Sequence, residues 1–488
     1  VGDPKFSRAH EQTASFSVAV TTRGRMFYVL DEAPAVDIRV PSQWSLIARD
    51  AFNGVILWKR PMGNWLNQFR RFRAGPANLP FRLVAEEDKV FVTLDFEGPV
   101  HMLDAATGKI LKVFKGTEKT KQIIYVDGTL TLLRDDEVGQ MSKIDDFRRR
   151  GEFMEHHCHL MRIDVETGKA IWETDVDELV FPCMAQKDGR IFAQSPKRVF
   201  ALDYKTGKQD WTMDFTSVLP ISGGKIRTGE MQWEAPTLVA GDGIVYAADF
   251  KKARAYQVET GKLIWEGSST NGYNAPADLL LINDLVWMGG KGSRRAIDPK
   301  TGEDVKSFKN TGGYMHARCY RNKGTEKFIM MGLMGVQMVD LENGEIYMND
   351  WVRGTCQFGV MPANGMLYVP PDSCACNMKT KLSGIYALSS STIQNIAKSS
   401  DGPVLEKGPA YGKVSKTPAK PGDWPTYRAS PARGGVSTTT IPKKLGTAWK
   451  NNIGGKLSGI TVANGRVYVA TVDQYEIHAI DEASGKTS

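Results

Sequence analysis

The sequence predicts an all-β fold, and more narrowly an eight-bladed β-propeller with four-stranded antiparallel blades. The first observation is compositional: 48 glycines in 488 residues, 9% aromatic residues and few long helical periods are typical of strands joined by many turns. The second is a short segment that recurs along the chain, and the third is the spacing of its copies. A single hairpin is marginally stable, so the copies must stack on their neighbours.

The recurring segment is clearest at residues 163–172, Ile-Asp-Val-Glu-Thr-Gly-Lys-Ala-Ile-Trp. It predicts a strand ending in an acidic residue, a tight Thr-Gly turn and a second strand ending in Trp. The glycine supplies the positive φ of the turn, whose backbone groups the acidic residue and Thr can bond. Trp buries a large ring and needs a partner for its N–H, so we expect it in a packed seam between repeats. Further copies lie at 202–211 and 257–265, and weaker ones carry Gly54 (with Trp58), Gly108, Gly302, Gly344 and Gly485.

The spacing of these copies predicts the blades. Successive turn glycines from Gly54 to Gly344 lie 39 to 60 residues apart. The shorter intervals match the roughly 40–45 residues of a four-stranded propeller blade, and the longer ones fit a blade with an insertion. Hairpins with their own turn signal, such as residues 238–246, precede these turns and alternate apolar with small or polar residues. We therefore expect eight blades up to about residue 391, the third interrupted by a charged insertion at 135–155.

Composition shifts divide the chain into three parts. Residues 1–395 form the eight-bladed propeller, and residues 396–422, rich in Lys, Pro, Ser and Gly, form a linker. Residues 423–488 hold one or more partial blades, which either begin a second propeller or close the first one. Because the chain opens at Val1 without Met and stops shortly after a turn glycine, we expect it to be part of a longer chain.

The net charge of +8 bears on the kind of partner. It favours anionic glycans, lipid head groups or nucleic acid, while an ordinary solvated basic surface is the alternative. No block of Lys and Arg interleaved with aromatic residues is present, so we expect no nucleic acid. No run of about 18 apolar residues is present, so the sequence predicts no transmembrane segment.

Six cysteines are present, an even number that permits disulfides. Cys356 and Cys374 flank one expected strand pair, where a bridge is plausible, and free buried thiols are the alternative. The full set is Cys158, Cys183, Cys319, Cys356, Cys374 and Cys376.

The recurring Asp-x-x-Thr-Gly-Lys-x-x-Trp resembles the repeat of PQQ-like propellers. It is complete at 164–172 and 203–211, lacks the Trp at 104–112 and replaces the Asp at 257–265. The Trp-Pro-Thr-Tyr-Arg that begins at Trp424 also resembles the start of many secreted bacterial proteins of this group. The resemblance covers nearly the whole chain. It implies blades interlocked through the Trp seam, in a periplasmic, cell-envelope or secreted bacterial protein.

Two kinds of protein in this superfamily differ in function. Quinoprotein alcohol dehydrogenases bind PQQ and Ca²⁺ in the central funnel, whereas the propeller lipoprotein of the outer-membrane β-barrel assembly machinery binds proteins and no cofactor. The dehydrogenases carry a vicinal Cys pair beside the quinone, and the nearest match here, Cys374-Ala375-Cys376, has a residue in between. No Cys-x-x-Cys-His motif for an attached haem is present. The resemblance therefore leaves PQQ with Ca²⁺ as a possible cofactor without a motif for it.

The leading expectation is a non-catalytic propeller that binds a protein or an anionic glycan (polysaccharide) through its central funnel. The alternative is an enzyme that uses the funnel, either a PQQ- and Ca²⁺-dependent alcohol oxidoreductase or a polysaccharide-acting lyase or hydrolase. Fold alone does not choose between these functions.

The candidate binding residues precede the first strand of each blade, because those loops converge on one mouth of the channel. Cationic, polar and aromatic groups recur there and suit an anionic sugar or peptide, while hydrogen bonds that only join blades are the alternative. His10 and His316 are candidates for acid–base catalysis, since imidazole titrates near neutrality. The binding candidates are Arg8, Glu11, Arg73, Trp233, Glu234, Tyr273, Asn274, His316, Arg318, Arg353 and Gln357.

The densest group of metal-ligand types is Glu-His-His-Cys-His at residues 155–159. His157 and His159 would share one face of a strand, since side chains alternate along it. With a third ligand from elsewhere they can hold Zn²⁺ or Cu²⁺. A polar strand edge beside the insertion is the alternative.

Overall fold

The computed structural model divides the chain into two compact units, residues 1–396 and 397–488, which we describe separately. The residues that the structure describes are 16–33, 42–63, 65, 79–136, 157–176, 179, 183–195, 197–215, 221–222, 225–226, 236–249, 251–270, 276–289, 293–309, 320–332, 335–355, 358–371, 382, 384–389, 411–412, 420–430, 432–472, 474 and 476–487.

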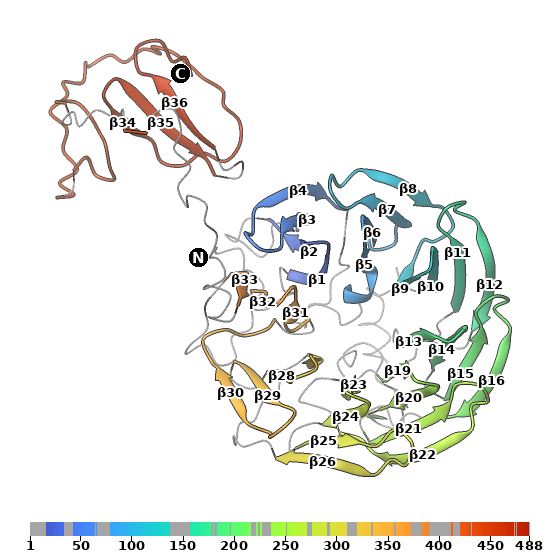
Figure 1. Ribbon diagram of the computed structural model, residues 1–488. Coiled ribbons are helices and arrows are strands. Elements are labelled where there is room, and N and C mark those ends of the chain that lie inside the picture. The colour runs from blue at the N-terminus through green and yellow to red at the C-terminus, as the bar shows by residue number, and fades with distance from the viewer. Residues whose placement is uncertain are drawn as a thin grey trace. The chain divides into compact units, whose positions relative to one another are not determined.

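The first unit is a propeller. Its described residues form seven four-stranded antiparallel sheets and one three-stranded sheet, each built from strands that follow one another in the chain. The sheets stand around a common hub, with the first strand of a sheet nearest the hub and the fourth at the rim (Figure 1). The all-β propeller class expected from the sequence is confirmed. We call the sheets blades and number them in chain order.

The first four blades contain β1 to β16, and a short 3-10 helix, η2, precedes the second. The bounds are β1 (Phe16–Thr22), β2 (Arg25–Asp31), β3 (Trp44–Asp50), β4 (Ile56–Pro61), η2 (Leu79–Arg82), β5 (Leu83–Glu86), β6 (Lys89–Thr93), β7 (Val100–Asp104), β8 (Ile110–Phe114), β9 (Thr120–Val126), β10 (Thr129–Asp135), β11 (Cys158–Asp164), β12 (Ala170–Val176), β13 (Met184–Lys187), β14 (Arg190–Gln194), β15 (Arg198–Asp203) and β16 (Gln209–Asp214).

Blades five to eight contain β19 to β33, and a small separate hairpin, β17 and β18, precedes them. The bounds are β17 (Ile221–Ser222), β18 (Lys225–Ile226), β19 (Thr237–Gly241), β20 (Ile244–Ala248), β21 (Lys252–Gln257), β22 (Leu263–Ser268), β23 (Leu280–Ile282), β24 (Leu285–Gly289), β25 (Ser293–Ile297), β26 (Asp304–Lys309), β27 (Lys323–Gly324), β28 (Phe328–Gly332), β29 (Val336–Asp340), β30 (Ile346–Asn349), β31 (Met361–Ala363), β32 (Met366–Val369) and β33 (Tyr386–Leu388).

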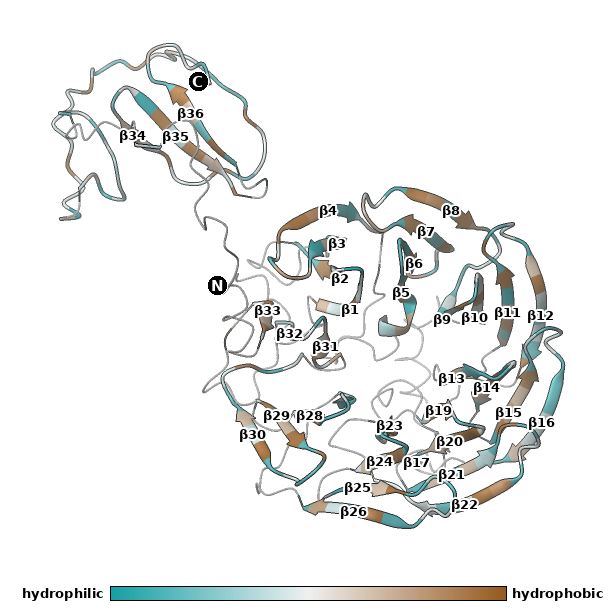
Figure 2. Cartoon of the chain, in the orientation of Figure 1, coloured by the Kyte–Doolittle hydropathy of each residue, from teal (hydrophilic) through white to brown (hydrophobic). Residues whose placement is uncertain are grey.

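The hydrophobic core is divided among the gaps between neighbouring blades. One cluster, for example, joins Phe192 and Val199 of the fourth blade to Val245 and Ala247 of the fifth. Middle strands such as β20 are buried along their whole length, whereas the rim strand β4 alternates between half-buried and exposed residues. Rim strands β4, β8 and β22 nevertheless carry hydrophobic residues (Figure 2). The interior of each blade therefore depends on both of its neighbours.

The ring closes where the eighth blade meets the first. The rings of Phe16 and Phe358 lie 5.6 Å apart between centroids, and Tyr368 Oη donates a hydrogen bond of 2.9 Å to Ala51 O. Strands of the first blade and of the eighth share one hydrophobic cluster around these residues. Closure among the described residues is therefore made by packing and a side-chain hydrogen bond between the first sheet and the eighth.

The recurring turn has the geometry expected from its sequence. Asp164 Oδ1 accepts hydrogen bonds from the backbone N (2.7 Å) and Oγ1 (2.8 Å) of Thr167. Gly168 has φ of 73° and donates its N–H to Asp164 O at 2.8 Å. The turns at Asp104 and Asp203 repeat the bonds to Thr.

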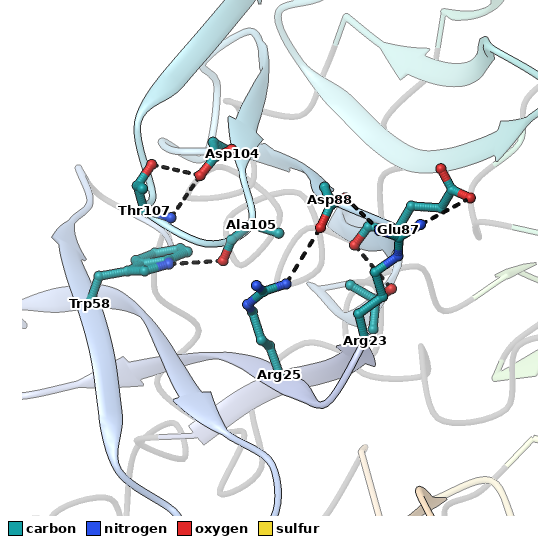
Figure 3. Close-up of polar contacts among 9 residues, drawn as sticks. Arg23, Arg25, Trp58, Glu87, Asp88, Asp104, Ala105 and Thr107 are labelled. Carbon is teal, nitrogen blue, oxygen red and sulfur yellow. Dashed lines mark hydrogen bonds and ion pairs between the residues drawn. The ribbon is translucent and has the colours of Figure 1, made fainter.

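The seam between blades is confirmed, and its donor bonds the turn of the next blade. Trp58 Nε1 donates to Ala105 O at 3.0 Å, beside the turn held by Asp104 and Thr107 (Figure 3). Trp172, Trp211 and Trp265 bond the equivalent carbonyls of the blades that follow them, at 2.8–2.9 Å.

The second unit repeats this seam on a smaller scale. Its described strands form one three-stranded sheet: β34 (Thr461–Ala463), β35 (Arg466–Thr471) and β36 (Glu476–Asp481). Trp449 Nε1 donates to Glu482 O at 2.8 Å, beside the turn glycine Gly485. The unit thus contains parts of two consecutive repeats.

The structure tests the expectations for the cysteines and for the insertion at 135–155 only in part. Cys158 and Cys183 are buried free thiols, while the other four cysteines lie outside the described residues. Most of the insertion at 135–155 also lies outside them. In the part of the chain that the structure describes, no helix is long and apolar enough to cross a membrane.

Candidate functional site

A cavity of about 280 Å³ lies at the hub of the propeller. Its wall is formed by residues at or near the first strands of the third to seventh blades, together with Phe81 of η2. The apolar part of the wall includes Phe81, Met184, Leu238 and Leu280. The polar part includes Gln122, Cys183, Asp278, Arg321, Asn322 and Lys323. An apolar pocket with a few converging polar groups is the usual form of a ligand site.

Asp278 is the acid of the cavity, and its carboxylate is already bonded. Asn322 donates to it twice, from the backbone N to Oδ1 at 3.2 Å and from Nδ2 to Oδ2. Burial raises the pKa of Asp278, whereas the nearby charge of Arg294 acts in the opposite direction. Asn322 thus fixes the acid in the wall by donating one hydrogen bond to each of its oxygens.

Arg321 is held in a fixed orientation by the fifth blade. Its Nη1 donates to Thr237 Oγ1 and its Nη2 to Pro236 O at 3.3 Å. Thr237 Oγ1 in turn donates to Ala277 O at 2.6 Å. The guanidinium is therefore a preorganised positive group that links the seventh blade to the fifth, two blades away in the ring.

Cys183 contributes a neutral thiol to the wall. Burial raises the pKa of Cys183 to about 12, although Arg321 acts in the opposite direction. Its Sγ lies 3.5 Å from Pro236 O, to which it donates. Because the thiolate is the nucleophilic form, a raised pKa disfavours nucleophilic chemistry at this position.

Lys323 is the cation of the cavity that lacks a partner. It begins β27 and is half-buried, and no hydrogen bond or ion pair of its side chain is found among the described residues. Burial, and after it the charge of Arg321, lowers the pKa of Lys323 to about 8, although Asp278 acts in the opposite direction. The ammonium is therefore mostly protonated at pH 7, yet poorly solvated.

Gln122 supplies an acceptor on the opposite part of the wall. This β9 side chain is 5% exposed, and its Nε2 donates to Met184 O at 3.5 Å. Its Oε1 is buried and has no hydrogen-bond partner in the described part of the chain. An unpaired buried carbonyl oxygen costs free energy, so a ligand that donates to it would gain affinity.

Other buried charges near the hub have structural roles. Lys121 Nζ pairs with Asp135 Oδ2 at 2.7 Å and also donates to Leu179 O at 3.1 Å. Arg82 donates to Phe96 O at 2.6 Å and lies 4.4 Å from the centroid of the Phe96 ring. Both side chains lie outside the cavity wall, and Arg82 Nε and Nη2 are buried without a hydrogen-bond partner among the described residues.

Most residues selected from the sequence lie outside the described residues. Arg353 is described: it is buried shortly before β31 and does not line the cavity. The others have no described position: Arg8, His10, Glu11, Arg73, Trp233, Glu234, Tyr273, Asn274, His316, Arg318 and Gln357. Their assignment to a funnel mouth stays a prediction.

His159 of the proposed metal pair is held by two carboxylates. Its Nδ1 lies 2.7 Å from Asp175 Oδ1 and its Nε2 lies 3.1 Å from Asp136 Oδ2. Within the described residues, no group of three or more His, Cys, Asp and Glu side chains is arranged to hold a metal ion. His157 precedes β11 and is exposed. A Zn²⁺ or Cu²⁺ site at His157 and His159 stays a prediction.

The polar groups of the cavity were not among the candidates selected from the sequence. In the sixth blade, the sequence analysis selected Tyr273 and Asn274 ahead of the first strand, whereas Asp278 lines the cavity. In the seventh blade it selected His316 and Arg318, and the cavity uses residues 321–323. The available signal was a charged residue beside or within an otherwise apolar inner strand, as at Asp278 before Leu279 and Leu280.

Comparison with known proteins agrees with the repeat. A family model described as outer membrane protein assembly factor BamB matches residues 158–274, which include both complete copies of the repeat. No curated protein matches the chain.

Three solved structures are similar to this chain. BamB from Moraxella catarrhalis has a TM-score of 0.46 at 13% identity, over 72% of this chain and 93% of that one. A quinohemoprotein alcohol dehydrogenase from Comamonas testosteroni has a TM-score of 0.46 at 12% identity, over 78% and 74%. The computationally designed Ika8 protein has a TM-score of 0.48 at 11% identity, over 78% and 97%.

Proposed function

We propose that this chain, which belongs to the PQQ-like repeat β-propellers, is a non-catalytic protein of the bacterial cell envelope or periplasm, or a secreted one, that binds a protein partner at its hub. One observation supports this proposal above the others. Among the described residues, the wall of the hub cavity holds two cations, Arg321 and Lys323, and one acid, Asp278, which accepts two hydrogen bonds from Asn322. A partner that brings a negative group to the hub would complete this arrangement.

The chemistry of the wall favours binding over catalysis. Arg321 is fixed by Thr237 and Pro236, and Cys183 is a neutral thiol. Neither arrangement pairs a nucleophile with a general base. The description of the matched family model names an outer-membrane assembly factor. This description favours a protein partner over a glycan, and it also favours a location in the cell envelope.

Affinity capture from an envelope extract of the native cell tests the proposal. The wild-type chain, Lys323→Glu and Lys208→Glu are immobilised in equal amounts, and captured material is quantified by mass spectrometry. Lys208 is an exposed turn residue at the rim, so its reversal changes the net charge equally without touching the hub. We expect a protein that is enriched by the wild type and by Lys208→Glu and lost with Lys323→Glu.

Other outcomes would assign the hub differently. Equal capture by all three proteins would place partner binding away from the hub. Capture of an acidic glycan in place of a protein would show that the partner at the hub is a glycan. A rise in melting temperature on addition of PQQ with Ca²⁺, abolished by Lys323→Glu, would favour the enzyme alternative.

A further inference from the structure

The charges that line the hub cavity do not balance. Asp278 is the acid among the described residues of the wall, and it accepts two hydrogen bonds from Asn322. Arg321 and Lys323 are two positive groups in the same wall. A poorly solvated cation without a partner is costly, so the cavity gains free energy from an anion.

The wall selects a single negative charge. Among the described residues, the two cations and Asp278 leave about one positive charge in the wall, which a monoanion neutralises. A phosphate or sulfate dianion would meet repulsion from Asp278 and would leave the apolar wall of Met184 and Leu238 uncovered. A carboxylate attached to an apolar body fits both parts of the wall.

Lys323 is the group free to bind that carboxylate. Arg321 is held in place by its bonds to Thr237 and Pro236, and from that fixed position it adds positive potential to the cavity. Lys323 has three donors and no partner among the described residues. The titratable groups around it in this cavity are Arg321 on its own segment, Asp278 ahead of β23 and Cys183 ahead of β13.

Gln122 defines the other end of the ligand. It lies on β9 of the third blade, and Lys323 begins the seventh blade, which faces the third across the hub (Figure 1). Gln122 Oε1 is a buried acceptor without a partner in the described part of the chain. A ligand that spans the cavity therefore needs an N–H or O–H donor at a distance from its carboxylate.

We propose that the hub cavity binds a monocarboxylate with an apolar body and an N–H or O–H group, placing the carboxylate on Lys323 and the donor toward Gln122. This inference deepens the proposed function, because it names the chemical group recognised at the hub. The same chemistry occurs in a free small acid and at the carboxyl end of a polypeptide, whose last amide supplies the N–H. The cavity volume of about 280 Å³ is near the lower end for small-molecule sites, so one residue or a small acid fills it.

Calorimetry with a matched pair of probes tests this inference. N-acetyl-leucine carries a carboxylate, an amide N–H and an apolar side chain, and N-acetyl-leucinamide lacks only the charge. We expect the acid to bind the full chain at pH 7 and the amide to bind at least tenfold more weakly. Lys323→Gln should weaken binding of the acid by roughly 10- to 100-fold, since a charge-assisted hydrogen bond is lost. Lys208→Gln should leave it unchanged, and circular dichroism confirms that both variants are folded.

The pH dependence separates a direct role of Lys323 from a structural one. The pKa of Lys323 is about 8, so its charged fraction falls about tenfold between pH 7 and pH 9. The affinity of the wild type for the acid should fall by about the same factor. Lys323→Arg keeps its charge throughout and should bind with little change over this range.

The two sources of the carboxylate are distinguished by a third probe. An acetylated tripeptide ending in leucine that binds more tightly than N-acetyl-leucine points to a polypeptide end, and equal or weaker binding points to a free small acid. The inference is overturned if acid and amide bind alike, if neither binds, or if Lys323→Gln and Lys208→Gln behave alike. If the carboxylate probes do not bind but Lys323→Glu still abolishes capture of a protein, this inference is rejected and the proposed function stands. Binding of the carboxylate without any captured protein rejects the proposed partner class alone.

Discussion

The indole ring of Trp172 lies against Gly207 of the next blade so closely that a Cβ added to this glycine would lie 2.6 Å from ring carbon atoms. Gly207 also has φ of 70°, in the left-handed region. The recurring glycine thus has two roles, because it shapes the turn and leaves room for the ring of the preceding blade. Gly261 with Trp211 and Gly302 with Trp265 show the same relationship.

Replacing Gly207 by alanine should therefore cost more than the turn conformation alone. Gly189 is the matched control, since it has φ of 71° and no atom within 4 Å of an added Cβ. We expect Gly189→Ala to lower the free energy of unfolding by about 1–2 kcal/mol. Gly207→Ala should lose a further 1–3 kcal/mol or so, because the seam is overpacked. Urea unfolding of both variants measures the difference, and equal losses would mean that the seam yields without strain.

The hydrogen bond of the seam gives a second prediction. Trp211 is 7% exposed, and its Nε1 donates to Val258 O at 2.9 Å. Trp211→Phe keeps an aromatic ring but leaves that carbonyl without the indole donor, so we expect a loss of about 1–3 kcal/mol in unfolding free energy. Denaturant titration followed by circular dichroism measures it. A variant as stable as the wild type would show that packing alone holds this seam.

Acid should weaken the turns that hold the blades. The hydrogen bonds from Thr206, first from its hydroxyl and then from its backbone N–H, lower the pKa of Asp203. A lowered pKa in the folded state contributes stability above the unfolded value of about 3.8, which is lost as pH falls through the folded pKa. Asp203→Asn should therefore melt below the wild type at pH 7 and approach it near pH 3. Asp188→Asn, in a nearby turn where no side-chain hydrogen bond to Asp188 is found among the described residues, should show a smaller difference at both pH values.

The sequence predicted the seam better than the hub because the two carry different signals. Asp, Thr, Gly and Trp of the seam act within a few residues of one another and recur, so their pattern reveals both turn and contact. No recurring sequence motif of this kind identifies the start of an inner strand. For that reason the expected site in the seventh blade lay at His316 and Arg318, a few residues ahead of Lys323, which lines the cavity.

The sequence pattern also failed to predict that another residue type can replace Trp in the seam. The copy at 104–112 lacks Trp, yet Lys112 occupies its place and donates to Val165 O at 2.9 Å. Its side-chain Cδ would lie 3.4 Å from a Cβ on Gly168, so the methylene chain covers the glycine as an indole does elsewhere. The seam requires a donor at the end of an apolar arm, and that requirement is met by more than one residue type.

The two carboxylates that contact His159 could not be predicted from the sequence, since Asp136 and Asp175 lie at the ends of different strands. Burial opposes the charged imidazole, but the hydrogen bonds and charges of Asp136 and Asp175 outweigh burial and raise the pKa of His159. A raised pKa contributes stability that is fully present below the unfolded value of about 6.5 and is lost as pH rises through the folded pKa. His159→Gln should therefore melt below the wild type at pH 5.5, with the gap closing toward pH 9. Asp175→Asn should reduce that pH dependence, because one of the two carboxylates that favour the imidazolium is removed. Melting curves across this range measure both effects, and a gap that widens with pH would mean that the histidine is neutral in the folded protein.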